Sequence, residues 1–404
     1  MLLENFHNGR PRILPVEYAT FRPDILDYFY KDVLPGMKAI FDPMCGTAPL
    51  IPYSEKHGLI AYFNDVLPVH YYINQTKTYS MYAALRKKEK HDKNYLSKEL
   101  YHCMKSLKGK KLLISDKWIH GDILEGLKKS WSAADEHELP LKSLIKALIL
   151  LCVRPYSSIT LSEKNRTWFK MGGISTEKTL LTIIREKIEL LSLFYQVHYQ
   201  ETHLKSKGWC HFSMEDATLL DLPNHVDGII TSPPYCNRLD NERIYAPELY
   251  FLKSVGYSNS ANGILGTNMV QDYVSLREDL NFINRVAPKT REFLQKVANK
   301  KEEDKAYYLK YFARYYAKLY RILENCSTLI RKGTKMFIVV QNNIHRGELN
   351  EMDEFVKDFF SIRGFRVDAS FRELRIHQGR RNISEHHPVV IKKHYETVLK
   401  VKPC

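Results

Sequence analysis

The sequence lacks any apolar run of the length that a membrane-spanning helix needs, about 18 to 20 residues. Its most apolar stretch, Ala147 to Val153, is short and lies between Lys146 and Arg154. The first residues, Met1 to Asn5, lack the basic flank and apolar block of a secretory signal. These absences predict a cytoplasmic protein without a membrane segment.

The sequence also lacks paired cysteines. Its seven cysteines are odd in number and scattered, and none forms a Cys-x-x-Cys motif. This pattern favours reduced thiols in a cytoplasm and argues against a disulfide scaffold or a zinc ribbon. His386 and His387 are adjacent, but no second pair stands at the spacing of metal ligands. We therefore expect no metal site.

Acidic residues are the scarcer charged class: 46 Asp and Glu stand against 61 Lys and Arg, which leaves a formal charge of +15. This excess makes a polyanion the leading class of partner. The hydrophobic fraction of 44% is that of a globular chain and excludes wholesale disorder. At about 100 to 200 residues per domain, the length predicts two domains or one large domain with an insertion.

Short apolar segments that stop at polar turns predict the strands of an α/β sheet. Met37 to Phe41 stops at Asp42-Pro43, and Leu59 to Phe63 stops at Asn64-Asp65. Strand, tight turn, helix and strand in succession are typical of a doubly wound sheet. Further elements that we expect are a helix at 24–29, strands at 226–230 and 335–340, a helix from about 351, an antiparallel pair near 365–372 and 393–401, and an irregular polar segment at 240–300.

Between the two halves of this pattern, residues from about 70 to 205 are mainly helical in character. Leu141 to Val153 predicts a buried helix, Ser157 to Thr176 a loop, and Thr179 to Tyr195 another helix. We therefore divide the chain into an N-terminal part of the sheet domain (1–75), a helical insertion (76–207) and a C-terminal part of the sheet domain (208–404). A later helix, Tyr307 to Leu323, carries an aromatic stripe at helical spacing that predicts core packing: Tyr308, Phe312, Tyr316 and Tyr320.

Two short motifs follow predicted strands, where open α/β sheets bind their ligands. The first is Phe41 to Pro49, whose turn of small residues lets the backbone approach a ligand. Asp65, after the next strand, is placed to accept hydrogen bonds from ribose hydroxyls. A plain strand-to-helix turn is the alternative interpretation of the first motif.

The second motif is Ser232-Pro233-Pro234-Tyr235. Consecutive prolines have no N–H to donate and predict a stiff exit from the strand with carbonyls directed into a cleft. Ser232 and the Pro233 carbonyl are two acceptors, and Tyr235 offers a ring face. This combination suits a planar amino group. The alternative is that the prolines only terminate the strand.

With these motifs the sequence resembles the S-adenosylmethionine-dependent amino-methyltransferases of DNA, which modify N4 of cytosine or N6 of adenine. Their cofactor loop reads roughly D-P-F-x-G-S-G-T; Asp42, Pro43 and Gly46 match it, while Ala48 and Pro49 depart from it. Residues 232–235 match the family's [D/N/S]-P-P-[Y/F/W] catalytic loop. The resemblance covers 15–70 and 208–401, and it implies a Rossmann-like doubly wound methyltransferase sheet with a large helical insertion.

The resemblance also implies roles for individual residues. Phe21-Arg22-Pro23 is similar to the segment whose aromatic residue packs on the cofactor's methionine end, and Asp216 to the acid that meets the adenine amino group. The implied catalytic residues are Ser232, Pro233, Pro234 and Tyr235. The implied residues for S-adenosylmethionine are Phe21, Pro23, Asp42, Pro43, Met44, Cys45, Gly46, Thr47, Asp65, Asp216, Ala217 and Ser232.

The serine form of the catalytic loop resembles the N4-cytosine branch. We therefore expect a site-specific methyltransferase of duplex DNA that flips its base and transfers the methyl group directly. The alternatives are an N6-adenine enzyme, an RNA amino-methyltransferase, and an inactive DNA-binding module of the same fold. We interpret Cys236 as a packing residue, because cysteine-dependent methylation at C5 uses a cysteine directly after a proline.

Double-stranded DNA is the expected partner, and a separate cognate restriction endonuclease is a further candidate. Phosphates and bases would be contacted from the insertion and from loops near the catalytic motif. The lysine-rich run Arg86 to Lys111 is either a DNA contact or a solvated helix face. The candidate DNA-binding residues are Arg166, Trp168, Lys170, Arg238, Arg243, Arg380 and Arg381.

Overall fold

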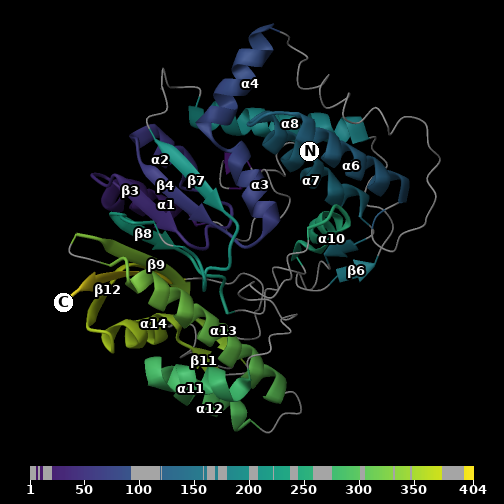
Figure 1. The fold of residues 1–404 in the computed structure, drawn as a ribbon. Helices are drawn as coiled ribbons and strands as arrows, with labels where there is room; N and C mark the ends of the chain where they lie inside the picture. Colours follow the sequence, from purple (N-terminus) through teal and green to yellow (C-terminus); the bar gives the residue numbers. More distant parts are fainter. Residues whose placement is uncertain are drawn as a thin grey trace.

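The computed structural model describes residues 6–7, 10–11, 21–91, 119, 121–157, 159–161, 169–171, 180–199, 208–221, 223–236, 244–257, 275–300, 305–330, 333–345, 348–374 and 395–404. Its centre is a seven-stranded sheet with helices on both faces (Figure 1). The predicted Rossmann-like α/β fold is confirmed. Among the described residues, no helix combines the length and apolarity needed to cross a lipid bilayer.

The sheet has the strand order β12-β13-β9-β8-β3-β4-β7. Five neighbouring strands run parallel, and β13 lies antiparallel between β9 and β12. The expected closing antiparallel pair is therefore confirmed. The strands are β3 (Ala39–Asp42), β4 (Ile60–Asn64), β7 (Trp209–Ser213), β8 (Gly228–Thr231), β9 (Lys335–Gln341), β12 (Phe365–Leu374) and β13 (Tyr395–Pro403).

Alternate side chains along the strands enter opposite cores, as the two-residue period of a strand requires. Ile40 and Ile230 face one core, packed under α1 (Pro23–Tyr28), the π-helical turn η2 (Phe29–Val33) and α2 (Ile51–His57). Phe41 and Ile229 face the other, under α13 (Lys305–Ser327) and α14 (Met352–Ser361). The central strands β3, β8 and β9 are buried on both faces, which explains their nearly continuous apolar sequences.

A third core belongs to the helical body beside the sheet, which Figure 1 shows next to β4 and β7. The apolar helix at 141–153 is confirmed as buried, and α3, before the predicted insertion, joins this core together with Ile244 and Phe251 far along the chain. The helices are α3 (Pro68–Thr76), α4 (Tyr79–His91), α6 (Gly121–Ala133), η4 (Ala134–Glu136), α7 (Leu141–Val153), η5 (Arg154–Tyr156), α8 (Leu180–Tyr199) and α10 (Ala246–Ser254).

Two predictions about irregular segments are wrong. The segment 240–300 contains α10, α11 (Leu276–Val286) and α12 (Pro288–Ala298). α11 starts at a capping box in which Ser275 and Glu278 bond each other's backbone, a signal that the sequence already carried. The loop 157–176 contains a hairpin of β5 (Ile159–Leu161) and β6 (Phe169–Met171). Two further short pairs are β1 (Phe6–His7) with β2 (Arg10–Pro11) and β10 (Asn343–His345) with β11 (Glu348–Asn350).

The tyrosine-rich helix has the predicted role. Its stripe of Tyr308, Phe312, Tyr316 and Tyr320 is buried in α13 against the sheet. The ring of Tyr320 stacks on Phe359 of α14 at 4.9 Å between centroids. α13 therefore packs in one core with α12, α14 and the sheet, and its Tyr315 contacts the loop at 232–235.

Candidate active site

The two sequence motifs leave the sheet from adjacent strands at the same edge. β3 and β8 are parallel neighbours, with Phe41 opposite Ile229. The order of the strands reverses between them, because β3 continues to β4 and β7 on one side and β8 continues to β9 on the other. Such a switch point is where open α/β sheets form a ligand crevice. The topology thus brings the loops after Asp42 and after Thr231 together.

The predicted cofactor loop, residues 43–49, has the turn expected from its sequence. Gly46 has φ +53°, in the left-handed region that favours glycine. Ala48 also has a left-handed φ, +43°. The family pattern has glycine at this position, so Ala48 keeps the turn at a conformational cost of about 1 kcal/mol.

Asn64, which the sequence analysis did not select, connects the cofactor loop to the loop after β7. Its Nδ2 donates to the carbonyls of Pro43 and Glu215, at 3.0 Å each. Its Oδ1 accepts from Ser213 Oγ at 2.8 Å and from the Glu215 amide at 3.0 Å. Asn64 is buried, and its four hydrogen bonds satisfy the side chain completely. It therefore fixes the spacing of the two loops.

Asp65, the predicted ribose-binding acid, is held by contacts within the protein. Its Oδ2 accepts from the Gly46 amide at 2.8 Å, and its Oδ1 accepts from the Leu67 amide at 2.8 Å. The Nδ1 of buried His70 lies 3.1 Å from Oδ2, and its Nε2 lies 3.0 Å from the hydroxyl of Tyr245. Each carboxylate oxygen has two lone pairs, so Oδ1 keeps the capacity for another hydrogen bond.

The junction between α3 and α4, residues 74–79, donates hydrogen bonds to the cofactor loop. Asn74 Nδ2 donates to the Gly46 carbonyl at 2.8 Å. The Lys77 ammonium, buried in the same place, donates to the Thr47 carbonyl at 2.7 Å. These two side chains satisfy carbonyls that the turn leaves outside any regular ladder.

The same junction is bound to α8 of the helical body. Tyr195 donates its hydroxyl to the Thr76 carbonyl, and Tyr199 lies within hydrogen-bond distance of the Lys77 carbonyl at 2.6 Å. Tyr199 also lies 2.7 Å from Oε2 of Glu55 on α2, which accepts from the Tyr79 amide at 2.7 Å. The junction is thus a continuous hydrogen-bonded path from α8 to the cofactor loop.

Two acids at this edge stand in different environments. The pKa of Asp42 is raised to about 7, mainly by burial and to a smaller extent by the nearby Asp65 carboxylate, against the lowering effect of contacts with Thr231 and the Met44 amide. Asp216 is half-buried after β7, and its Oδ1 accepts from both the amide and the hydroxyl of Thr218 at 2.9 Å. Its Oδ2 makes no hydrogen bond within the described part of the chain.

The predicted catalytic loop, residues 232–235, is pinned from two sides. Tyr315 on α13 donates its hydroxyl to the Pro234 carbonyl at 2.6 Å. The Tyr235 hydroxyl donates to Oε1 of Glu396, which comes from β13. Ser232 is half-buried and Pro233 is buried. Neither the serine hydroxyl nor the Pro233 carbonyl takes part in a hydrogen bond among the residues that the structure covers.

Buried amides lie beneath this loop. Asn343 Nδ2 donates to the Cys236 carbonyl at 2.6 Å, Asn350 Nδ2 donates to Asn343 Oδ1 at 3.1 Å, and Tyr316 donates to Asn350 Oδ1. Burial raises the pKa of the Cys236 thiol well above its ordinary value. The buried position of Cys236 in the α13 core agrees with its interpretation as a packing residue.

The remaining predicted cofactor residues flank the loop. Phe21 is buried in the α1-side core that also contains Cys45 and Ala48, with its ring edge-on to Phe29 at 5.2 Å. Met44 is partly buried against the opposite core. Burial raises the pKa of the Cys45 thiol well above its ordinary value, so this cysteine stays protonated. Three further predicted residues complete this edge: Pro23 at the start of α1, Thr47 beside Gly46, and Ala217 in the α13-side core.

Most of the candidate DNA-binding residues lie outside the described residues: Arg166, Trp168, Arg238, Arg243, Arg380 and Arg381. Lys170 lies on β6, for which the backbone alone is described. From the lysine-rich run, Arg86 and Lys87 are exposed on α4. Within the described ranges no cluster of three or more metal-ligating side chains occurs.

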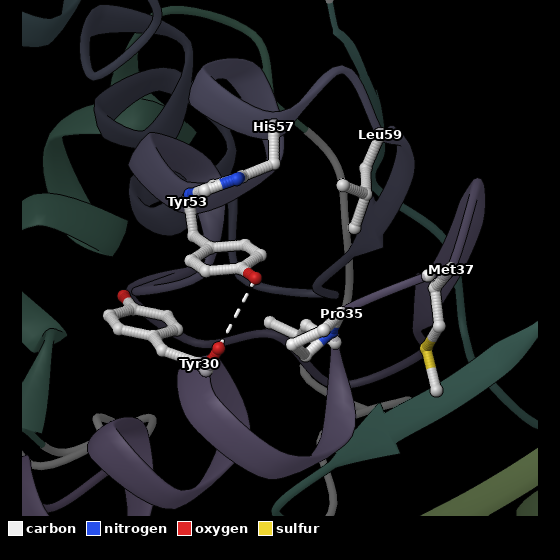
Figure 2. A pocket seen from close by; sticks show the side chains of 8 residues that line it. Tyr30, Pro35, Met37, Tyr53, His57 and Leu59 are labelled. Carbon is white, nitrogen blue, oxygen red and sulfur yellow. Dashed lines mark hydrogen bonds between the residues drawn. The ribbon is translucent and has the colours of Figure 1, made fainter.

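A pocket of about 520 Å³ lies at the opposite edge of the sheet, near the amino ends of β3 and β4. Figure 2 shows its aromatic wall, in which Tyr53 lies between Tyr30 and His57. The Tyr53 hydroxyl donates to the Tyr30 carbonyl at 3.2 Å. Because the sequence motifs leave the sheet at the other edge, this pocket is separate from the candidate active site.

Comparison with known proteins gives one informative similarity. The chain is 25% identical over 248 residues to the Type II methyltransferase M.BsoBI of Geobacillus stearothermophilus, an alignment that covers 53% of this chain and 47% of that protein. The chain thus spans about half the length of the curated relative it matches. No protein-family model matches the sequence.

Proposed function

We propose that this chain is a DNA methyltransferase of the restriction–modification type that transfers a methyl group from S-adenosylmethionine to the exocyclic N4 amine of cytosine in duplex DNA. The observation that carries the proposal is the convergence of two loops at the switch point. The Asp42-Pro43-Met44-Cys45-Gly46 loop and the Ser232-Pro233-Pro234-Tyr235 loop leave adjacent parallel strands at one edge. The similarity to a Type II methyltransferase supports the same class of reaction.

The chemistry of the residues at this edge fits S-adenosylmethionine. Asp65 retains acceptor capacity for ribose hydroxyls, and Asp216 has a carboxylate oxygen for the adenine amino group. The left-handed turn at Gly46 brings backbone close to this site without a side chain. When bound, the cofactor supplies an electrophilic methyl group on a sulfonium.

The catalytic loop then has two tasks. The Ser232 hydroxyl and the Pro233 carbonyl accept hydrogen bonds from the two N–H groups of the target amine. These bonds draw the nitrogen lone pair out of conjugation with the ring and direct it toward the methyl group. Tyr235 stacks on the base. The contribution of these residues is orientation and hydrogen bonding to the reacting amine. The loop is pinned at Pro234 and Tyr235 before any substrate binds, which reduces the entropy lost on binding.

A base inside a duplex cannot reach this edge, so the target nucleotide must flip out at a cost of a few kcal/mol. The proposed target-recognition region is the helical insertion at 76–207, with the lysine-rich run that begins at Arg86 near its start. Positive charge on the chain, +15 overall, favours binding of the DNA backbone.

The decisive experiment maps methylation. DNA from cells that express the chain, sequenced by a method that distinguishes N4-methylcytosine from N6-methyladenine, reports base and context together. Methylated cytosine N4 in a fixed sequence context is the expected result. Methylated adenine would move the chain to the N6 branch, and unmodified DNA from cells with folded protein would contradict the proposal. Purified protein incubated with labelled cofactor and either duplex DNA or tRNA separates a DNA enzyme from an RNA enzyme.

A further inference from the structure

The carboxylate of Glu396 lies between the catalytic loop and the N-terminal Phe-Arg-Pro segment. Its Oε1 accepts the hydrogen bond from the Tyr235 hydroxyl, and its Oε2 lies 3.7 Å from the Nε of Arg22. Glu396 pairs with Gln341, the last residue of β9, so it enters the site at the same edge as the two loops. Nothing in the sequence motifs pointed to this residue.

The side chain of Glu396 is 3% exposed, and a buried carboxylate needs hydrogen bonds and a nearby cation. The Tyr235 hydroxyl gives the first and the Arg22 guanidinium the second. Arg22 is itself fixed by Asp24, which accepts from its Nε and Nη2 at 3.1 Å each. The four side chains therefore form one chain of contacts from the start of α1 through β13 to the catalytic loop.

A hydrogen bond to a buried carboxylate is stronger than one between neutral groups. It fixes the hydroxyl end of the Tyr235 ring, while Tyr315 fixes the adjacent backbone at the Pro234 carbonyl. With both ends held, the ring has a single orientation before a base arrives. An unanchored tyrosine would have to give up rotamer freedom on stacking.

We propose that Glu396 and Arg22 are positioning residues that hold the Tyr235 ring in the plane that stacks on the extruded base. This inference rests on the proposed function, since it assigns the base to the Tyr235 ring. Glu396 acts through Tyr235 and not through the methyl donor. Removal of the hydroxyl or of its acceptor should therefore have the same consequence for DNA.

The test is a double-mutant cycle of Tyr235→Phe and Glu396→Leu, which removes the acceptor at similar volume, measured as kcat/KM for duplex DNA. Each single variant is expected to lose about tenfold, the loss typical of one hydrogen bond to a charged group, and the double variant about tenfold as well. The affinity for S-adenosylmethionine, measured by titration calorimetry, stays within about twofold of the wild type. Fluorescence of 2-aminopurine at the mapped target position should show weaker ordering of the flipped base.

Tyr320→Phe is the matched control, because it removes a buried tyrosine hydroxyl that bonds Thr290 between α13 and α12, away from the loop. It should leave kcat/KM unchanged. Losses that multiply in the double variant, wild-type rates in both single variants, or a parallel loss of cofactor affinity would each overturn the inference. If Glu396→Leu does not fold, the comparison of kcat/KM between Tyr235→Phe and Tyr320→Phe decides. A wild-type chain that methylates no DNA would instead refute the proposed function itself.

Discussion

At the scale of single residues, Ser232 and Tyr235 carry the proposed chemistry. Their effect on methyl transfer can be measured separately from cofactor binding. Ser232→Ala removes one acceptor of the amine and is expected to lower kcat about 10²- to 10³-fold. Tyr235→Ala removes the stacking ring and is expected to lower kcat/KM for DNA about 10- to 100-fold. Both should still bind S-adenosylmethionine, although Ser232→Ala also loses the cofactor contact that the resemblance implies for this residue. Transfer of labelled methyl groups and calorimetric titration measure the two properties, with Ser361→Ala at an exposed position of α14 as the control. Full turnover in either variant would contradict the assignment.

Asp42 offers a second prediction at the scale of one residue. Because burial raises its pKa to about 7, this carboxyl is part protonated at neutral pH. A cationic ligand nearby favours the ionised form, so binding of S-adenosylmethionine should release a fraction of a proton, up to about one half at pH 7. Calorimetry in two buffers of different ionisation enthalpy measures this release.

Two comparisons make this measurement specific to Asp42. S-adenosylhomocysteine lacks the sulfonium charge and should release fewer protons. Asp42→Asn should release none with either ligand. Equal proton release by Asp42→Asn and the wild type would show that another group titrates.

At the scale of elements, the number of hydrogen bonds that the α3–α4 junction can form depends on whether Glu55 is protonated. Tyr199 has one hydroxyl proton but lies close to both Glu55 Oε2 and the Lys77 carbonyl. A protonated Glu55 can donate to the tyrosine oxygen, which leaves the tyrosine proton for Lys77. Burial raises the pKa of Glu55 to about 7, against the lowering effect of its bonds from Tyr199 and Tyr79. The contacts and the pKa thus agree on a protonated form at or below neutral pH.

This raised pKa predicts a stability that falls as pH rises. The folded state holds the proton more tightly than the unfolded state, whose ordinary value is 4.5. The stabilisation is complete below that value and is lost as pH rises through about 7, a change of about 3 kcal/mol in the free energy of unfolding. Glu55→Gln, which imitates the protonated form, should lack this loss.

Denaturant unfolding at pH 5, 6, 7 and 8 checks the prediction. The difference between Glu55→Gln and the wild type should move in favour of the variant as pH rises. Glu125→Gln, an exposed carboxyl paired with Lys128 on α6, should keep the wild-type dependence. Parallel curves for the wild type and Glu55→Gln would remove Glu55 from the explanation.

At the scale of the whole molecule, the charge of +15 predicts a strong dependence of DNA binding on salt. A protein that neutralises six to ten phosphates loses about 10³ to 10⁵ in affinity between 50 and 200 mM salt. Fluorescence anisotropy of a labelled duplex over this range should give a log–log slope of about −5 to −9. A slope shallower than about −2 would contradict an extended backbone contact, and the affinity for cofactor should change far less.

The central sheet and the two loops could be predicted from the sequence, but the side-chain contacts that connect them could not. Strands such as 39–42 and 60–64 could be found because they are apolar on both faces and stop at polar turns. Asn64, Lys77 and Glu396 could not be found, since their roles depend on partners from 21 to 161 residues away. α11 and α12 were missed because a helix that is buried along one stripe looks polar on average, although the Ser275 capping box marked a start.

The tie between α8 and the cofactor loop sets a rule for making chimaeras. Replacing the helical body, the proposed target-recognition region, with that of another protein also removes Tyr195 and Tyr199. The graft would leave Glu55 and the carbonyls of Thr76 and Lys77 without these hydroxyls, directly below the Gly46 turn. A donor helix must therefore supply two tyrosines in the same register. Without them, exchange of the helical body also removes hydrogen bonds that hold the segment next to the cofactor loop.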